Sequence, residues 1–261
     1  MIPIKDNIPT DRLPIVTIAL ILLNVVVYLL SIRHGGSLIS GPEAHETVRY
    51  GAIPFELTHP GKHCDLIQNF VQQAIGCEGQ PGISGTATSQ PATWETVFTS
   101  MFMHASILHI GGNMLFLWIF GNNVEDSMGR LKFIGFYLLG GLAALALQVA
   151  VGPNSTAPTV GASGAIAAVL GGYILLYPRA RVLTLVFIIL FFTVIELPAL
   201  AVLGIWFVEQ AVFAGAGLTN PTGNSGGVAY FAHVGGFAFG LATIKLLASK
   251  PKPVPPRFPV Y

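Results

Sequence analysis

The sequence predicts an all-α, polytopic membrane protein, a bundle of six transmembrane helices. The first observation is composition: 52% of the 261 residues are hydrophobic and only 10% are charged, whereas soluble globular chains carry about 25% charged residues. The second is that several apolar runs reach or approach the roughly 20 residues that one helix needs to cross a bilayer. The third is an uneven distribution of basic residues between the two sides of those runs. A formal net charge of +1 gives no indication of a nucleic-acid partner.

Six apolar segments are expected to span the membrane. The first is too long for the apolar region of an ordinary signal peptide, which has about 7–15 residues, so we expect it to be retained. Region 182–218 is long enough for one span plus a surface segment, or for two short spans. The expected spans are residues 13–32, 97–120, 131–151, 162–177, 197–216 and 228–247.

Charge asymmetry decides between six and seven spans, because Lys and Arg in short flanking segments collect on the cytoplasmic side. With six spans and a cytoplasmic N-terminus, only Arg33, Arg49 and Lys62 of the thirteen basic residues lie outside. A seventh span would move the four C-terminal basic residues outside, so we predict six, with residues 183–195 at the cytoplasmic interface. The cytoplasmic basic residues are then Lys5, Arg12, Arg130, Lys132, Arg179, Arg181, Lys245, Lys250, Lys252 and Arg257.

This topology divides the chain into three parts. Residues 1–12 form a cytoplasmic N-terminus, residues 13–248 form the membrane domain with an external loop at 33–96, and residues 249–261 form a proline-rich cytoplasmic tail. Both termini are therefore expected in the cytoplasm. We expect the protein in the cell membrane, that is, a plasma or inner membrane.

The external loop contains both cysteines, Cys64 and Cys77. In an oxidising exterior they could pair as a disulfide, which would close a loop that has little apolar core of its own. His59 and His63 lie close by, so a metal site is a second interpretation, although the spacing matches no strong zinc pattern. Free thiols are the third.

Five polar side chains are candidates for function, because polar residues at membrane depth are costly to bury. The second expected span contains His104, His109 and Asn113, the fourth begins near Ser163, and the sixth has His233 near its start. Each has an ordinary structural interpretation: a serine at a helix start is usually an N-cap, and a histidine in a span is usually an interhelical hydrogen-bond partner. The topology nevertheless makes these three spans parallel and puts the polar residues in the outer half of the bilayer, facing the external side.

A serine and a histidine on different spans can act together if hydroxyl and ring nitrogen approach within about 2.6–3.2 Å. Small residues at four-residue intervals would let the fourth and sixth spans come that close. His109 and Asn113 share one helical face and, with the Ser163 backbone N–H, could donate hydrogen bonds to an oxyanion. The second, fourth and sixth spans hold no carboxylate to orient His233 as a base, and nothing in the sequence links Glu196 or Glu209 to this histidine. The small residues are Gly164, Ala168, Gly172, Gly236 and Gly240.

At these positions the sequence resembles the rhomboid intramembrane serine proteases. The resemblance implies a rhomboid-like six-span fold in which Ser163 is the nucleophile and His233 the general base of a Ser–His dyad, with His109 and Asn113 as oxyanion donors. It also implies that the substrates are transmembrane segments of other membrane proteins and that no metal, nucleotide or organic cofactor takes part. His104 is a motif member without an assigned role. The motifs are His104-xxxx-His109-xxx-Asn113, Gly161-Ala162-Ser163-Gly164, Ala232-His233-xx-Gly236 with Gly240, and the string from Phe120 to Arg130.

The sequence departs from that family at two places. Many rhomboids carry a tyrosine four residues after the nucleophile, packed against the histidine; here that residue is Ala167, so something else must support His233. Trp94-Glu95 stands near the place of a Trp-Arg pair. A catalytically silent relative that binds membrane proteins is the alternative function, and the intact motifs argue against it. A transporter would show related halves, and a metalloprotease would need an H-E-x-x-H helix; this sequence shows neither.

Overall fold

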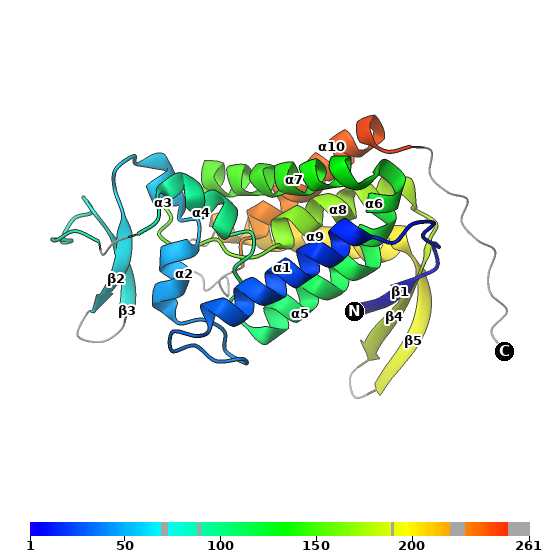
Figure 1. Ribbon diagram of the computed structural model, residues 1–261, viewed down its shortest axis with the longest axis horizontal. Helices are drawn as coiled ribbons and strands as arrows, with labels where there is room; N and C mark the ends of the chain where they lie inside the picture. The colour runs from blue at the N-terminus through cyan, green and yellow to red at the C-terminus, as the bar shows by residue number, and fades with distance from the viewer. Residues whose placement is uncertain (69–72, 88–89, 189–190, 220–227, 250–261) are drawn as a thin grey trace.

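Helices make up most of the protein, and the long ones run roughly along the long axis of the molecule (Figure 1). The computed structural model describes residues 1–68, 73–87, 90–188, 191–219 and 228–249. All but the first residue of the expected tail, 249–261, lies outside the described residues. The long helical segments are α1 (Ile15–Ser31), the continuous run of α5 (Ile107–Phe116), the π-helical η1 (Leu117–Gly121) and α6 (Asn122–Met128), then α7 (Arg130–Val151), α8 (Ser163–Leu176), α9 (Ala199–Thr219) and α10 (Tyr230–Leu247).

Three of the described helices are long and apolar enough to cross a membrane, namely α7, α9 as far as Leu218, and α10. The helices α1 and α8 are apolar but shorter. Helices stand within a few residues of the spans expected at 13–32, 131–151, 162–177 and 228–247. The number of six crossings stays a prediction.

The second expected span, residues 97–120, begins later than predicted. The chain first forms the short helix α4 (Thr93–Thr99) and a loop. α5 starts only after Ser106, because the Ser106 hydroxyl accepts a hydrogen bond from the backbone N–H of His109 at 3.2 Å and caps the helix. The prediction that His104 lies inside the span is therefore wrong: it lies in the loop before α5.

The prediction of an all-α chain is wrong at two places, where strands form small antiparallel sheets. β1 (Ile2–Asp6), β4 (Arg181–Ile188) and β5 (Phe191–Pro198) form a three-stranded sheet in the order β1-β4-β5. The described part of segment 183–195, expected at the cytoplasmic interface, belongs to the β4–β5 hairpin. Its many β-branched and aromatic residues favour extended strands.

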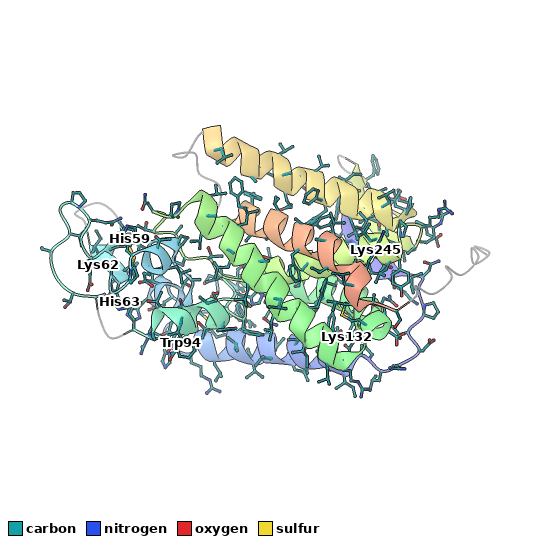
Figure 2. The ribbon with its side chains drawn as sticks, turned by 90° about the horizontal axis from the view of Figure 1, so that it is seen from above. His59, Lys62, His63, Trp94, Lys132 and Lys245 are labelled. Carbon is teal, nitrogen blue, oxygen red and sulfur yellow. A yellow bond between two sulfur atoms is a disulfide. The ribbon has the colours of Figure 1, made fainter. Side chains whose placement is uncertain are left out.

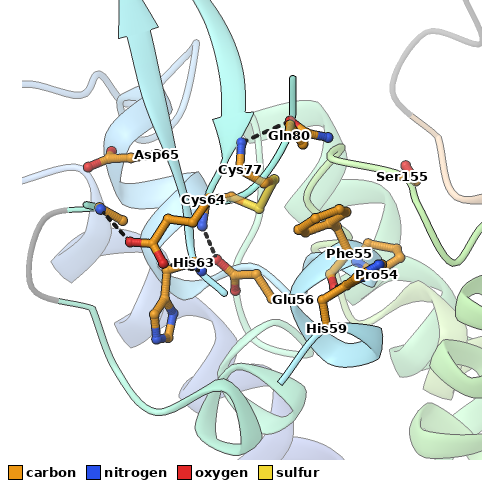
Figure 3. The surroundings of a disulfide bond; sticks show 12 residues. Pro54, Phe55, Glu56, His59, His63, Cys64, Asp65, Cys77, Gln80 and Ser155 are labelled. Atoms are coloured by element: carbon orange, nitrogen blue, oxygen red, sulfur yellow. Dashed lines mark hydrogen bonds between the residues drawn. A yellow bond between two sulfur atoms is a disulfide. The ribbon is translucent and has the colours of Figure 1, made fainter. Parts of the chain in front are cut away.

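The second sheet carries the disulfide. Cys64 in β2 (Cys64–Gln68) is bonded to Cys77 in β3 (Gln73–Cys77), so the disulfide is the correct one of the three interpretations. Glu56 is 2% exposed, and its carboxylate accepts a hydrogen bond from the Cys64 backbone N–H at 2.6 Å (Figure 3). Burial raises the pKa of Glu56 above its usual value.

The two sheets lie at opposite ends of the helices (Figure 1). We call the end with β2 and β3 the disulfide end, and the end with β1, β4 and β5 the sheet end. α8 begins toward the disulfide end, because Thr159, shortly before it, pairs with Ala52 of that region. Lys132 and Lys245 lie toward the sheet end, away from Lys62 (Figure 2). The short helices of the disulfide end, besides α4, are α2 (Ala44–Tyr50) and α3 (Pro54–Thr58).

α8 packs against α10 with the two backbones in direct contact. A Cβ atom at Gly236 would collide with the carbonyl oxygen of Gly164, and one at Gly240 would collide with the carbonyl oxygen of Ala168. These residues belong to the small-residue stripes predicted to bring the two helices together, and that prediction is confirmed. Every residue of α8 from Gly164 to Ile174 is buried, so α8 is the central helix of the bundle.

Buried polar groups fasten β1 and α1 to the bundle at the sheet end. Asp6, the last residue of β1, accepts hydrogen bonds from the Tyr173 hydroxyl of α8 at 2.5 Å and from the Asn123 amide of α6 at 2.7 Å. Glu125 of α6 accepts hydrogen bonds from the backbone N–H and the hydroxyl of Thr17, both at 2.8 Å. Glu125 thereby satisfies a donor in the first turn of α1 that has no partner within the helix. Burial raises the pKa of the Asp6 carboxyl from 3.8 to about 6.

Replacing Gly240 by Ala should lower the thermal midpoint of unfolding in detergent. The added methyl group collides with the backbone of α8 at Ala168, and overpacking of this kind costs about 1–3 kcal/mol. Gly204→Ala on α9 is the matched control, because a Cβ there meets nothing within 4 Å. Equal midpoints for the two variants would show that the α8–α10 contact is not as tight as described.

Replacing Asp6 by Asn should remove part of the pH dependence of stability. The folded pKa of about 6 lies above the ordinary value of 3.8, so the wild-type protein loses stability as the pH rises through that window. Asn keeps an acceptor for Tyr173 but cannot ionise. The thermal midpoint of Asp6→Asn minus that of wild type should therefore increase as the pH rises from about 4 to about 7. Glu95→Gln, at an exposed position of α4, should show the same pH dependence as wild type. A difference in thermal midpoint between Asp6→Asn and wild type that stays constant over this pH range would contradict the prediction.

Candidate active site

Ser163 and His233 meet where α8 and α10 begin. Ser163 is the first residue of α8, and His233 lies in the first turn of α10. The His233 Nε2 atom lies 2.8 Å from the Ser163 Oγ atom, within hydrogen-bond distance. The close approach of the two backbones brings these first turns together. The structure therefore places the two residues predicted as a pair next to each other.

His109 and Asn113, both on α5, line the same cavity as Ser163 and His233. Its volume is about 480 Å³. Gly161, which has a φ of 124°, makes room for the imidazole: a Cβ atom there would lie 2.8 Å from two ring atoms of His109. All four residues predicted for the site thus surround one cavity, although they come from three helices.

His104 is completely buried and has a partner that the sequence did not predict. Its Nε2 atom lies 2.9 Å from Nδ2 of Asn113, and its Nδ1 atom lies 3.2 Å from the carbonyl oxygen of Phe102. A carbonyl oxygen only accepts hydrogen bonds. The ring proton therefore belongs on Nδ1, and Nε2 accepts from the Asn113 amide. One amide hydrogen of Asn113 is fixed in this way, and the other remains for a further acceptor.

Helix α9 contributes two side chains that the sequence did not predict. The Oε1 atom of Gln210 lies 2.7 Å from Nδ1 of His233, and the ring centroids of Trp206 and His233 are 5.7 Å apart. Tyr230 of α10 contacts the same ring edge-on, at 6.4 Å. These side chains support His233, as Ala167 cannot. The spacing of Trp206 and Gln210, four residues apart, was the available signal, because it puts both on one face of a helix.

The two carboxylates considered for orienting the base lie away from it. Glu196 is exposed in β5, and Glu209 is exposed on α9. The hydrogen bond to Nδ1 of His233 comes from an amide, that of Gln210. The prediction that no carboxylate orients this histidine stays a prediction.

Residues 91–250 match the family model described as the Rhomboid domain. The chain belongs to the rhomboid family. Its membership, together with the apolar helices, makes it a polytopic membrane protein, as the sequence predicted.

Several curated rhomboid proteins are similar to the chain. Rhomboid protein 1, mitochondrial, of Saccharomyces cerevisiae is 35% identical over 101 residues, which are 35% of this chain and 28% of that protein. Presenilin-associated rhomboid-like protein, mitochondrial, of Homo sapiens is 33% identical over 110 residues, or 40% of this chain and 28% of that protein. RHOMBOID-like protein 12, mitochondrial, of Arabidopsis thaliana is 31% identical over 159 residues, or 55% of this chain and 43% of that protein. The chain spans less than half the length of each of these relatives.

Proposed function

We propose that this rhomboid is an intramembrane serine endopeptidase that cleaves transmembrane segments of membrane proteins. The observation that carries the proposal is the 2.8 Å hydrogen bond between Ser163 Oγ and His233 Nε2, in a cavity that His109 and Asn113 also line. Ser163 is the nucleophile and His233 is the general base. A serine hydroxyl is a weak nucleophile by itself and needs such a base to take its proton.

The reaction proceeds in two halves. Ser163 Oγ attacks the scissile carbonyl carbon while its proton passes to His233 Nε2, and the tetrahedral intermediate collapses as that proton is given to the leaving amine. Water then hydrolyses the acyl-enzyme with the same base. The free amide hydrogen of Asn113, a ring N–H of His109 and the backbone N–H of Ser163 stabilise the oxyanion. His104 acts through Asn113, since it holds the other amide hydrogen.

The orientation in the membrane follows from the two ends of the molecule. The sheet end faces the cytoplasm, because the cytoplasmic side collects basic residues and Lys132 and Lys245 lie there (Figure 2). The disulfide end faces an oxidising exterior, and α8 begins toward that end, so the active site opens to the external half of the membrane. In this proposal the chain crosses six times and both termini are cytoplasmic. The three domain parts expected from the sequence stay a prediction, as does the cell membrane; the relatives described above are mitochondrial by name.

Transmembrane segments fit this site because it lies between membrane helices. The cavity is lined by apolar side chains, among them Met101, Leu145 and Leu170, together with the polar residues. A substrate peptide in that cavity exchanges lipid for apolar protein surface, and its scissile carbonyl meets the polar groups. The reaction as written needs water and no cofactor.

Ser163→Ala should abolish cleavage of a model transmembrane substrate in liposomes, because no other hydroxyl is hydrogen-bonded to His233 in the described part of the chain. Wild type, but not Ser163→Ala, should also be labelled by a fluorophosphonate at this serine. Ser249→Ala is the control, since Ser249 is exposed just beyond the end of α10, far from the start of that helix. Undiminished cleavage by Ser163→Ala would refute the proposed mechanism.

Asn113→Ala should lower kcat by about 10²–10³-fold, the effect of removing one oxyanion donor. His104→Leu should lower kcat less, and adding it to Asn113→Ala should change little, because His104 acts through the Asn113 amide. The measurement is a double-mutant cycle on kcat for the model substrate. Fully additive losses would show that His104 acts independently of Asn113.

A further inference from the structure

We propose that Gln210 is a positioning residue that holds His233 in the one tautomer able to accept the Ser163 proton. The effect on catalysis rests on the proposed function, whereas the tautomer itself does not. The helix α9, which supplies Gln210, is separate from the helices that carry the rhomboid motifs.

Two hydrogen bonds at opposite sides of the His233 ring determine its tautomer. Gln210 Oε1, 2.7 Å from Nδ1, is a carbonyl oxygen and can only accept, so Nδ1 carries the proton. A neutral imidazole carries a single N–H, so Nε2 has a free lone pair. That lone pair accepts the hydroxyl proton of Ser163, whose Oγ lies 2.8 Å away. The two contacts are therefore mutually consistent, and both agree with a general base ready to act.

The opposite arrangement would be inactive. If the amide group of Gln210 were turned so that its nitrogen donated to Nδ1, the ring proton would move to Nε2. His233 would then donate to Ser163 Oγ and could not take its proton. The orientation of one buried amide thus distinguishes a competent base from an incompetent one, as the hydrogen bond at the second nitrogen of a histidine generally does.

The surroundings of Gln210 indicate that its place is specific. It is 7% exposed, and among the described side chains of α9 it is the one polar side chain that is buried. Its neighbours Val208 and Val212 are exposed apolar residues on the outer surface of the helix. Trp206, one turn earlier on the buried face, packs on the same imidazole. One face of α9 therefore supports His233 through a ring and an amide.

A neutral partner suits a histidine at this depth. A buried carboxylate would bring a second charge with a large desolvation cost, whereas the amide accepts the same hydrogen bond without one. The imidazolium formed during the reaction is stabilised by the Gln210 carbonyl dipole and by the Trp206 ring. That ring lies 5.7 Å away, within the about 6 Å over which cations interact with aromatic faces.

Three variants test the proposal. Gln210→Leu keeps the approximate size and removes the acceptor, Gln210→Glu keeps an acceptor at the same reach, and Glu209→Leu is the matched control at the exposed neighbouring position. Gln210→Leu should lower kcat and the rate of fluorophosphonate labelling at Ser163 by about 10–100-fold, by analogy with the loss of a partner that orients a metal-bound histidine, with KM unchanged. Gln210→Glu should restore most of the rate, and Glu209→Leu should behave as wild type.

The tautomer is read directly by ¹⁵N NMR of protein labelled at histidine, with His233→Asn used to assign the signals. Wild type should show a protonated Nδ1 and an unprotonated Nε2, and Gln210→Leu should show a fraction with Nε2 protonated. A wild-type ring protonated at Nε2, or wild-type labelling rates in Gln210→Leu, would overturn the proposal. If Gln210→Leu does not fold, judged by its thermal midpoint, Gln210→Met takes its place. If NMR shows the expected tautomer but Ser163 reacts with neither the substrate nor the fluorophosphonate, the protease function is refuted and the inference about the tautomer stands.

Discussion

The direct contact of two helix backbones sets the geometry of the whole site. Gly236 and Gly240 have no side chain, so carbonyl groups of α8 fill the space that a Cβ atom would occupy on α10. Close-packed backbones leave little freedom in the separation of the helices. His233 lies three residues before Gly236, and Ser163 lies directly before Gly164. The 2.8 Å hydrogen bond between them is therefore a consequence of helix packing and does not depend on long, flexible side chains.

At the sheet end of the bundle, buried polar groups hold the N-terminal segment in place. The motif from Phe120 to Arg130 contributes no side chain to the cavity, and two of its polar residues hold the N-terminal segment. Asn123 binds Asp6 of β1, and Glu125 binds the first turn of α1. The same α6 helix continues from α5, which carries His109 and Asn113 at its other end. One helical run thus connects the His109 and Asn113 side of the cavity to the anchors of the N-terminal segment.

What the sequence predicted, and what it did not, follows from how each feature arises. The helices α7 and α8 follow from long apolar runs, and the Ser163–His233 pair was predicted from two short motifs, the small residues beside them and the resemblance to the rhomboid family. The β4–β5 hairpin was missed because periodicity cannot distinguish a continuous apolar run in strands from one in a helix. His104 was misplaced because the start of α5 depends on the cap at Ser106. Gln210 was missed because the face that α9 turns toward α10 is decided by tertiary packing.

Neutral hydrogen-bond partners are the common principle of this site. His233 is bonded to the amide of Gln210, and Asn113 is bonded to the imidazole of His104, which in turn is held by a backbone carbonyl. Carboxylates in these places would orient the same groups, but at membrane depth each would carry a desolvation cost that its hydrogen bonds only partly offset. An amide and a neutral ring orient equally well and add no charge. The proposed dyad of Ser163 and His233 therefore lies inside a framework of uncharged donors and acceptors, which would suit serine chemistry within a bilayer.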